Sequence, residues 1–445
     1  MKHLKSNLAL ILIAAMLVTI LTGCGNPKQE AEHAPAAEDG GKVTLTMISS
    51  TEFEKTTFSD LEGTFAKFPD KAPNVKIDAE FLPWTEVDSK LFLTNAGNEY
   101  YDIVLVNVST LPALIQAGIL ADMSSYAEAD GFDPHEVFTP AMANLATYGD
   151  GIYALPFETD TRVLAVNTKI LEEENLELPE TKEDMLEIAK AVTKDLDGDG
   201  VNDQFGYSMN ISRTLPCIYI QGNWLLGNGL HVYDIEDNGN IVSKLDSEAG
   251  VDFFNWASEM GKYMPNDMIS YDNAMIDNAF ATGKFAMYTY GAWMHSRDDF
   301  NKTVAENNTE YKLILNPAGT ESRASTSGGW MLGVSSKCQN KQGAWDFIKF
   351  MVDPEVNASV CSALPPVKEA YNYPPFNDAK FDILAEQLLT SDTAVGQFVP
   401  EFNEIVDVYG TNLISAILGE QEPAAAAKAA ADGVNAILKD KGYQK

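Results

Sequence analysis

Basic residues are scarce in this 445-residue sequence, which has 31 Lys and Arg against 65 Asp and Glu. The formal net charge is therefore −34 at pH 7. A chain this acidic is not drawn to nucleic-acid phosphates, and it lacks the charge of a basic membrane-binding surface. The shortage of positive charge thus excludes nucleic acid as an electrostatic partner.

Cysteine and histidine are also few, with four and five residues respectively. Beyond Cys24 the cysteines are Cys217, Cys338 and Cys361, an odd number that makes no disulfide framework. Simple burial is the favoured interpretation, and one disulfide among the three stays open. The scattered histidines form no recognisable metal triad. The chain also has no internal repeat, nucleophile elbow, HExxH motif, P-loop or dinucleotide fingerprint.

The first residues have the features of an export signal. Lys2 and Lys5 precede an apolar run over residues 8–21, which is too short for a comfortable membrane span. The run ends at LTGC, where a small residue stands directly before Cys24. This arrangement resembles the lipobox of bacterial lipoproteins, in which the cysteine becomes the lipidated N-terminus. A plain signal peptide over residues 1–23 with an incidental cysteine is the alternative.

Residues 24–41 have no apolar periodicity and contain several Ala, Glu, Pro and Gly. Such a segment cannot bury enough surface to fold, so we predict a flexible tether. The remaining chain is long enough for two lobes, each with a substantial core. The N-terminal region therefore predicts a folded part that is held at a membrane but works in water.

Strand and helix patterns alternate along the chain, which predicts an α/β fold. Residues 43–49 and 75–81 alternate apolar and polar positions, and residues 58–68 between them are apolar at helical spacing. This order favours a parallel βαβ unit. Residues 101–107 form a continuous apolar run, as is typical of a strand covered on both faces. An alanine-rich tail from residue 424 predicts a closing helix.

Several sequence segments, in this order along the chain, resemble segments of extracellular solute-binding proteins that serve bacterial ABC importers, specifically those of the carbohydrate-binding group. The resemblance covers nearly the whole chain after the lipobox. YDIVLVN with LIQAGILADMSSY resembles a strand and its following helix, and LPETKEDMLEIAKAVTK resembles a later helix. Three segments resemble the successive crossovers between the lobes: DGIYALPFETDTRVLAVNTKIL, TGKFAMYTYGAWM and SGGWMLGVSSKCQNKQGAWDFIKFM. LPPVKEAY fits the segment after the last crossover.

The resemblance implies a bilobal, type II binding-protein fold whose two α/β lobes hold a ligand in the cleft between them. Ligands there lie against loops at strand ends, and the lobes close by a hinge motion. We expect a monomer that delivers a sugar or oligosaccharide to the membrane subunits of an importer. The expected N-terminal lobe comprises residues 42–157 and 283–335, and the C-terminal lobe comprises residues 158–282 and 336–445.

Tryptophan is the natural platform for a sugar, because its ring packs against the C–H face. Trp293 matches a position where the family often stacks an aromatic ring on sugar, and Trp330 follows two glycines. Trp224 lies in a glycine-rich segment and Trp84 follows a strand end. Each of the four has a place in the hydrophobic core as its alternative. Trp256 and Trp345 are predicted to be core residues.

Carboxylates, amides and guanidinium groups near strand ends are the predicted partners of sugar hydroxyls. Asp160 in the first crossover falls where the family commonly supplies a carboxylate. Arg162 is a second candidate there, with a purely structural ion pair to Asp160 as the alternative. The remaining polar candidates are Glu52, Asn107, Ser109, Glu158 and, more weakly, Glu321 and Arg323.

The stretch DLDGDGVND places four carboxylates in nine residues and resembles the first part of an EF-hand loop. Position twelve carries Gly206 in place of a bidentate glutamate, so Gln204 or a more distant oxygen has to complete a metal shell. We predict a structural calcium site, with a solvated acidic turn as the alternative. The predicted ligands are Asp195, Asp197, Asp199, Asp203 and the carbonyl of Val201.

Two other functions compete with sugar capture. A glycoside-processing enzyme would use paired carboxylates, but pairs are unavoidable in so acidic a chain. A calcium-dependent surface adhesin would usually show repeats. Metal import is a weaker third alternative, because the adjacent Tyr100 and Tyr101 point apart on a strand. The sequence therefore predicts a binding protein that does not alter its ligand.

Overall fold

The protein is described by a computed structural model that covers residues 43–54, 61–97, 99–211, 215–396 and 398–444. The predicted export signal, Cys24 and the predicted tether lie outside the described residues. Residues 41–445 belong to one compact unit. Within the described ranges, no helix is both long and apolar enough to cross a membrane.

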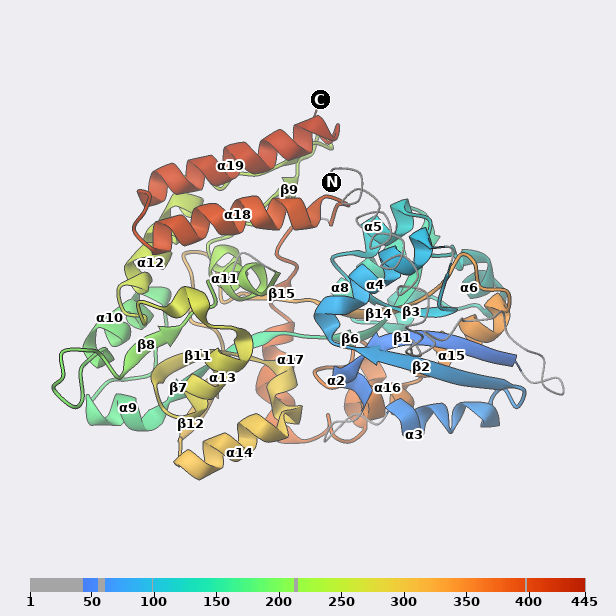
Figure 1. Ribbon diagram of the computed structural model, residues 1–445, viewed down its shortest axis with the longest axis horizontal. Coiled ribbons are helices and arrows are strands. Elements are labelled where there is room, and N and C mark those ends of the chain that lie inside the picture. The colour runs from blue at the N-terminus through green and yellow to red at the C-terminus, as the bar shows by residue number, and fades with distance from the viewer. Residues whose placement is uncertain (1–42, 55–60, 98, 212–214, 397, 445) are drawn as a thin grey trace, which may run out of the picture. The chain divides into compact units, whose positions relative to one another are not determined.

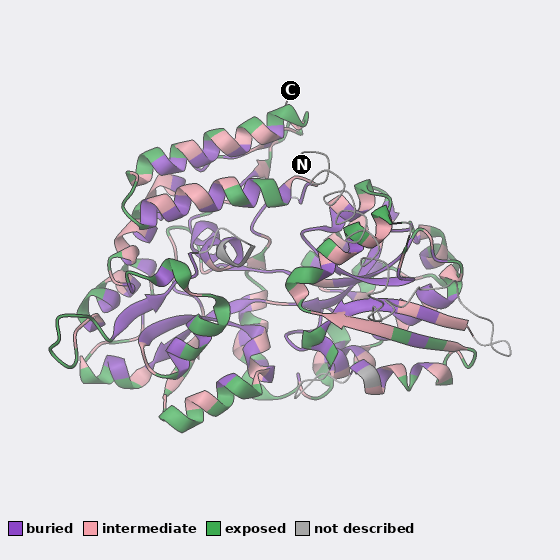
Figure 2. Ribbon diagram, viewed as in Figure 1, coloured by how far each residue is buried: buried purple, intermediate pink, exposed green. Residues whose placement is uncertain are grey.

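Five strands form the first sheet, in the order β2-β1-β3-β14-β6 (Figure 1). β1 runs parallel to β2 and to β3, whereas β14 is antiparallel to both β3 and β6. Every residue of β3 is buried, as its continuous apolar run predicts (Figure 2). The strands of this sheet are β1 (Val43–Ser50), β2 (Val75–Leu82), β3 (Ile103–Asn107), β6 (Ala154–Thr159) and β14 (Gly329–Val334).

Four strands form the second sheet, in the order β12-β7-β11-β8. β7 is antiparallel to β11 and β12, and β11 runs parallel to β8. The bounds are β7 (Arg162–Asn167), β8 (Phe205–Ser208), β11 (Phe285–Gly291) and β12 (Tyr311–Ile314). Short two-stranded pairs join β4 (Thr147–Tyr148) to β5 (Gly151–Ile152), β9 (Asp234–Ile235) to β10 (Ile241–Val242), and β13 (Ser325–Thr326) to β15 (Ser391–Asp392).

Helices pack against both sheets. In the first lobe, α4 (Trp84–Ala96) packs on β1 and β3, and α15 (Lys341–Met351) packs on β14 and β6. In the second lobe, α10 (Lys182–Val192) packs on β8, α13 (Asn273–Ala281) on β11, and α17 (Asp382–Leu388) on β7. The predicted capping box of Thr181 and Asp184 is present at the start of α10. The predicted α/β class is therefore confirmed.

The other helices complete the two lobes. α12 (Glu248–Gly261), α18 (Phe402–Ile417) and the predicted closing helix α19 (Pro423–Asp440) pack against one another. Further helices are α2 (Thr51–Glu54), α3 (Leu61–Phe65), α5 (Leu111–Gln116), α6 (Ser124–Asp130), α7 (Pro134–Val137), α8 (Pro140–Ala146), α9 (Thr168–Glu173), α11 (Leu215–Gly227), α14 (Asp298–Asn307) and α16 (Pro354–Val360). Five short 3-10 turns are η1 (Phe68–Asp70), η2 (Met268–Ser270), η3 (Ala292–Ser296), η4 (Lys368–Asn372) and η5 (Ala379–Phe381).

The lobe boundaries differ from the expected ones in two places. Residues 283–335 were assigned to the N-terminal lobe, but β11 and β12 pair with β7 in the second sheet, so the second predicted crossover does not cross. Residues 336–445 were assigned to the C-terminal lobe, but α15 and α16 pack against β14 and α3 of the first. The reason is that strand alternation reports burial and does not report which strand is the partner.

Three connections do link the two sheets. The first is the short link from β6 to β7, as predicted, and the second leads through β13 into β14. The third lies between η4, which packs on α16, and α17, which packs on β7. The side chains at the first two connections therefore lie between the lobes.

Candidate functional site

Trp330 is placed by the irregular start of β14. The backbone of Gly329 has φ of 146°, and a Cβ on that residue would lie 2.2 Å from the carbonyl oxygen of Glu158. Only glycine fits there, and the strand register shifts between Trp330 and Met331. The same pairing sets Trp330 beside Asn107 on one neighbouring strand and beside Glu158 on the other.

Trp330 belongs to an aromatic cluster in the first lobe, which we call the aromatic corner and which consists of Trp330, Trp84 and Phe53. The Trp330 ring meets the Trp84 ring edge to face, with centroids 6.4 Å apart, and it meets the Phe53 ring at 6.3 Å. Phe53 is fully buried, whereas both tryptophans are partly exposed. Two indoles thus keep accessible surface on a rigid base, as a sugar platform requires.

The end of β3 adds polar groups next to this corner. Asn107 Oδ1 accepts hydrogen bonds from the backbone N–H of Ser109 at 3.0 Å and from its hydroxyl at 2.6 Å. Thr110 donates its hydroxyl to Asp88 Oδ1 at 3.2 Å. Asp88 lies one helical turn after Trp84, and burial raises the pKa of its carboxyl to about 6. The predicted candidates Asn107 and Ser109 are both buried at this edge.

Glu158 is bound inside the first lobe. Its Oε2 accepts from the backbone N–H groups of Ser362 at 2.5 Å and Ala363 at 2.9 Å, and from the Ser362 hydroxyl at 2.9 Å. Burial raises the pKa of Glu158 to about 8, although these donors favour the charged form. The carboxyl therefore anchors the segment after α16, and one of its oxygens is already occupied.

Asp160 and Arg162 form the ion pair that was the structural alternative. Arg162 donates from Nη1 to Asp160 Oδ1 at 2.5 Å and from Nη2 to Oδ2 at 3.3 Å. The backbone N–H of Gly328 also donates to Asp160 Oδ1, at 2.7 Å. The first two of the three connections between the lobes are thus tied together by this carboxylate. Asp160 is a positioning residue with little accessible surface left for a ligand.

Trp293 and Tyr219 both pack against the guanidinium of Arg162. The guanidinium carbon of Arg162 is 5.1 Å from the centroid of each ring. The Trp293 indole packs on the backbone of Gly291, where a Cβ would come within 2.2 Å of the ring. Trp293 is partly exposed, so a flat cationic layer supports an aromatic surface that remains accessible.

Three buried polar atoms in this region have no hydrogen-bond partner among the residues that the structure describes. They are Ser49 Oγ at the end of β1, Arg162 Nε, and Tyr219 Oη. The Tyr219 ring lies close to Gly328, and its pKa is raised by burial first and then by the Asp160 and Asp88 carboxylates. The Ser109 side chain opposes the rise in the Tyr219 pKa, so the tyrosine of the second lobe lies near the end of β3 in the first. Unpaired buried polar atoms are costly unless something binds them.

Glu52 belongs to the same region. It is exposed on α2, directly after β1, but the surrounding protein raises the pKa of its carboxyl. The charge of Arg297, at the start of α14 in the second lobe, opposes this shift. Glu52 and Arg297 thus interact electrostatically from different lobes.

Some predicted residues lie elsewhere. Trp224 is 1% exposed, packs on Trp256 with centroids 5.2 Å apart, and donates from Nε1 to Tyr207 Oη at 3.2 Å. It is a core residue, and we remove it from the candidate site. Arg323 pairs with Glu180 on the second lobe, and Glu321 packs against Gly229, so neither joins the cluster.

The core predictions hold for the other two tryptophans. Trp345 is fully buried and donates from Nε1 to Asp130 Oδ2 at 2.8 Å, and Trp256 is 4% exposed. Cys338 and Cys361 are buried free thiols, which matches the predicted burial. The side chain of Cys217 lies outside the described residues.

Sequence reasoning missed four members of the cluster: Ser49, Asp88, Tyr219 and Arg297. Asp88 had a signal, because it follows Trp84 by four residues and so shares its helix face. Tyr219 and Arg297 had no such signal, since each reaches the region through the packing of the second lobe.

A surface hollow of about 520 Å³ between α10, α12 and the start of α19 contains none of the residues of this cluster.

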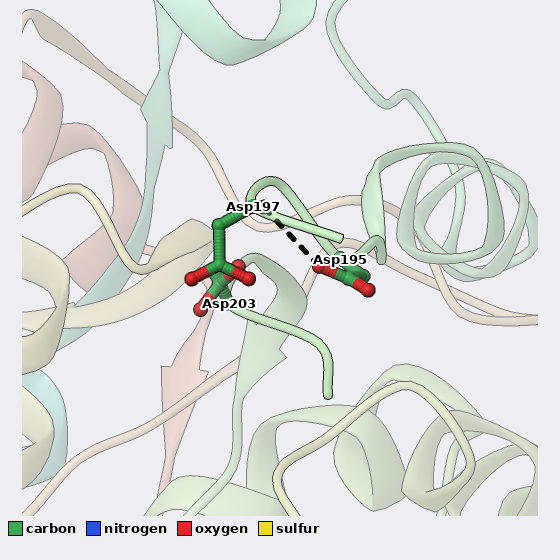
Figure 3. Close-up of side chains that lie close together, drawn as sticks. All are labelled: Asp195, Asp197 and Asp203. Carbon is green, nitrogen blue, oxygen red and sulfur yellow. Dashed lines mark hydrogen bonds between the residues drawn. The ribbon is translucent and has the colours of Figure 1, made fainter. Parts of the chain in front are cut away.

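The acidic loop brings three of its four aspartates together. Asp195, Asp197 and Asp203 each place a carboxylate oxygen within 4.8 Å of the others (Figure 3). Backbone N–H groups of Gly200 and Gly198 donate to Asp195 and lower the pKa of its carboxyl. These turns need glycine, because φ is +82° at Gly198 and +93° at Gly200.

The rest of the predicted shell is not assembled. Asp199 is outside the group of three and accepts from the N–H of Val201 at 2.8 Å. Gln204 is buried and donates from Nε2 to the Val192 carbonyl at 2.8 Å. Gly206 at the twelfth position packs on Ala189 of α10, where any Cβ would come within 2.2 Å of the Ala189 Cβ. Helix packing, and not metal binding, explains the missing glutamate.

Two α/β lobes, linked by crossing segments that carry aromatic and polar side chains between them, define the architecture of a bilobal binding protein. The family model for bacterial extracellular solute-binding proteins matches residues 55–358, and the chain belongs to this family. The resemblance seen in the sequence is thereby confirmed, and the family places the protein outside the cytoplasm.

Individual relatives agree with this assignment. A chain of Brucella abortus named only as a binding protein is 25% identical over 419 residues, covering 91% of this chain and 95% of that one. The GacH receptor of Streptomyces glaucescens, solved unliganded and with acarbose, matches with a TM-score of 0.72 at 23% identity, over 89% of this chain and 98% of that chain. A Listeria monocytogenes ABC substrate-binding protein in complex with cycloalternan also has a TM-score of 0.72, at 20% identity, over 89% and 99%. The type II bilobal fold is therefore confirmed.

Proposed function

We propose that this protein captures a sugar or oligosaccharide between its lobes and delivers it, unaltered, to an ABC importer. The observation that carries the proposal is the pair of accessible aromatic surfaces, Trp330 with Trp84 on one lobe and Trp293 on the other. Such surfaces pack on the C–H faces of sugar rings. The ligands in the solved relatives, which include acarbose and cycloalternan, support the same class of ligand.

The unpaired atoms supply the polar half of the proposed site. Arg162 Nε is a donor, whereas Ser49 Oγ and Tyr219 Oη each donate and accept. A sugar hydroxyl does both, so these groups suit it better than a purely cationic ligand would. Asp160 and Glu158 position the surrounding segments and do not contact the ligand directly. Arg162 and Gly328 donate hydrogen bonds to Asp160, and the segment after α16 donates to Glu158.

The test is direct binding by the chain that begins at Gly25. A carbohydrate panel should include a sugar that raises the melting temperature, because a ligand that binds only the folded state stabilises it. Calorimetry then gives the affinity, and chromatography of the recovered ligand shows whether it is intact. A peptide or metal ion that stabilises the protein when no carbohydrate does would refute the ligand class. A cleaved ligand would favour the glycoside-processing alternative instead.

A lipid anchor at Cys24 is a second part of the proposal. LTGC after a short apolar run supports it, and a Streptomyces antibioticus relative that is 22% identical over 359 residues is named as a lipoprotein. In a bacterial host the chain should fractionate with membranes, and the Cys24→Ala chain should not. Mass spectrometry of the mature N-terminus should find a lipidated cysteine. Membrane association that survives Cys24→Ala would refute this anchor.

A structural calcium ion in the acidic loop is the third part. Hard oxygen ligands suit calcium, and Asp195, Asp197 and Asp203 lie close enough together to share one ion. The ion would offset the repulsion among these carboxylates and hold the turn between α10 and β8. No aromatic candidate belongs to this loop, so the ion would support the fold rather than the ligand.

A further inference from the structure

Acidic side chains outnumber basic ones around the aromatic surfaces, and this excess affects which ligands the site can accept. Two arginines and four carboxylates belong to this region: Arg162, Arg297, Glu52, Asp88, Glu158 and Asp160. Whether a charged ligand is accepted depends on which of these charges already have a partner. The pairing can be followed residue by residue.

Arg162 is neutralised inside the protein. Both of its terminal nitrogens bind the two oxygens of Asp160, and Nη1 also donates to the Thr326 carbonyl at 3.1 Å. Its faces are covered by Tyr219 and Trp293. Only Nε remains unpaired, and a single N–H cannot form the bidentate fork that an arginine uses to hold a carboxylate or phosphate.

Arg297 is neutralised as well. It binds Asp299 through two hydrogen bonds, Nε to Oδ1 at 2.8 Å and Nη2 to Oδ2 at 2.6 Å. Its Nη1 lies 3.6 Å from a carboxylate oxygen of Asp277. Two aspartates therefore share this one guanidinium, and little positive charge is left for a ligand.

Glu52 and Asp88 have no such partner. Within the described ranges, neither carboxylate has a basic nitrogen within ion-pair distance, and Lys90 on the same helix as Asp88 pairs with Glu80 instead. Asp88 accepts a hydrogen bond from the neutral hydroxyl of Thr110. Burial raises the pKa of the Asp88 carboxyl, and the surrounding protein raises the pKa of the Glu52 carboxyl although the charge of Arg297 opposes that shift. Glu158 adds a buried carboxyl beside Trp330.

The unpaired buried atoms show that this acidic region is built to hold something. Ser49 Oγ, Arg162 Nε and Tyr219 Oη are each at least nine-tenths buried, and together they offer hydroxyls and one N–H. These groups match the hydroxyls of a neutral sugar. Among the described residues, both arginines of this region are already paired, so an anionic sugar would enter next to two carboxylates that have no ion-pair partner there.

We propose that the interlobe site discriminates against anionic glycans and takes neutral or amino sugars, because Glu52 and Asp88 repel a ligand carboxylate or phosphate. This inference rests on the proposed carbohydrate function and names the class of sugar. The specificity of the site would then come from repelling anionic ligands as well as from attracting neutral ones, since specificity is a difference between two affinities.

The experiment compares glucose-, mannose- and galactose-based disaccharides with their uronate and 2-amino counterparts. Melting shifts and calorimetric affinities are measured on the chain that begins at Gly25, at low ionic strength. For whichever backbone binds, the neutral and amino forms should bind at least about tenfold more tightly than the uronate, which corresponds to about 1.4 kcal/mol. A uronate that binds as tightly as its neutral counterpart overturns the inference and leaves carbohydrate capture intact. A panel in which nothing binds overturns carbohydrate capture, and the inference with it.

Variants locate the cause of the discrimination. The double substitution Glu52→Gln and Asp88→Asn keeps the size of both side chains and removes their charge, so the ratio of neutral to uronate affinity should fall severalfold. Glu54→Gln is the matched control, because Glu54 is an exposed carboxylate on the same short helix as Glu52. Moderate salt should also reduce the ratio in the unmutated protein, since it screens exposed charge. A ratio that is equal in the double variant and in the control refutes the assignment to Glu52 and Asp88.

Discussion

Replacing Trp293 by alanine should weaken carbohydrate binding much more than it weakens folding. The indole lies on the backbone of Gly291 and under the guanidinium of Arg162, and it is only partly buried. Its removal takes away one of the two aromatic surfaces and leaves the Arg162 charge without a ring on that side.

The expected loss follows from the contacts that disappear. Stacking on one aromatic side chain contributes about 1–3 kcal/mol by analogy with nucleobases, so the dissociation constant should rise by about 5- to 150-fold. The lost cation–π contact costs a further 0.5–1 kcal/mol, approximately, and this affects folding and binding together. Trp293→Phe keeps a flat ring and should recover most of the affinity.

Calorimetric titration with the best carbohydrate of the panel measures the affinity, and urea unfolding measures the stability of the same samples. Trp345→Ala is the contrasting variant, because Trp345 is fully buried on α15 and belongs to neither of the first two crossing segments. It should cost about 3–5 kcal/mol of unfolding free energy, with affinity little changed in the protein that remains folded. An unchanged dissociation constant in a folded Trp293→Ala protein would refute the role of this ring.

Three further predictions concern stability. Calcium at about a hundredfold above its dissociation constant should stabilise the protein by about 2.7 kcal/mol, and Asp197→Ala should abolish this gain in a melting experiment with and without chelator. Burial lowers the pKa of His231, but hydrogen bonds to Asp392 and Asp234 raise it above the usual value overall. The stability from His231 should therefore be complete below about pH 6.5 and be lost as pH rises through the folded pKa, which His231→Gln should abolish in urea unfolding. Gly329→Ala should lower stability by about 1–3 kcal/mol in the same assay, because alanine is strained at φ of 146°.

Each of these has a result that contradicts it. No calcium-dependent shift in the unmutated protein would reduce the loop to an acidic turn, and a large loss of sugar affinity in folded Asp197→Ala protein would place the loop in the ligand site. Identical pH dependence with and without His231 would remove it as a source of stability. For Gly329→Ala, the control is alanine at Gly118, which also has positive φ but has open space around it. Equal losses at the two positions would show that the close contact at Gly329 is unimportant.

Much of the local structure was predictable because local signals determine it. The alternation of residues 43–49 gave β1, the apolar run of residues 101–107 gave a buried strand, and Thr181 with Asp184 gave a capped helix start. These features depend on neighbours within a few positions, where periodicity and side-chain capping act. The order of the resembling sequence segments was enough to predict the family and the bilobal fold, both of which are confirmed.

The membership of the candidate site was predicted only in part. Trp293, Asn107 and Glu52 were predicted from their places after strands, since loops at strand ends carry binding groups in α/β folds, and Trp330 was predicted from the two glycines before it. Trp224 was misplaced, because a glycine-rich surrounding does not distinguish a binding loop from close packing in a core. Asp160 and Arg162 were left with two interpretations, and the hydrogen bond from Gly328 shows the structural one.

The sequence by itself determined the acidic charge, the α/β order of elements, the family and the residues that follow each strand. Only the tertiary structure decided that β11 belongs to the second sheet, that Tyr219 reaches Gly328 between the lobes, and which carboxylates have cations. The physical reason is separation along the chain. Strand pairing, and hydrogen bonds such as the one from Gly328 to Asp160, join residues more than a hundred positions apart, and no local pattern records which distant partner satisfies a given group.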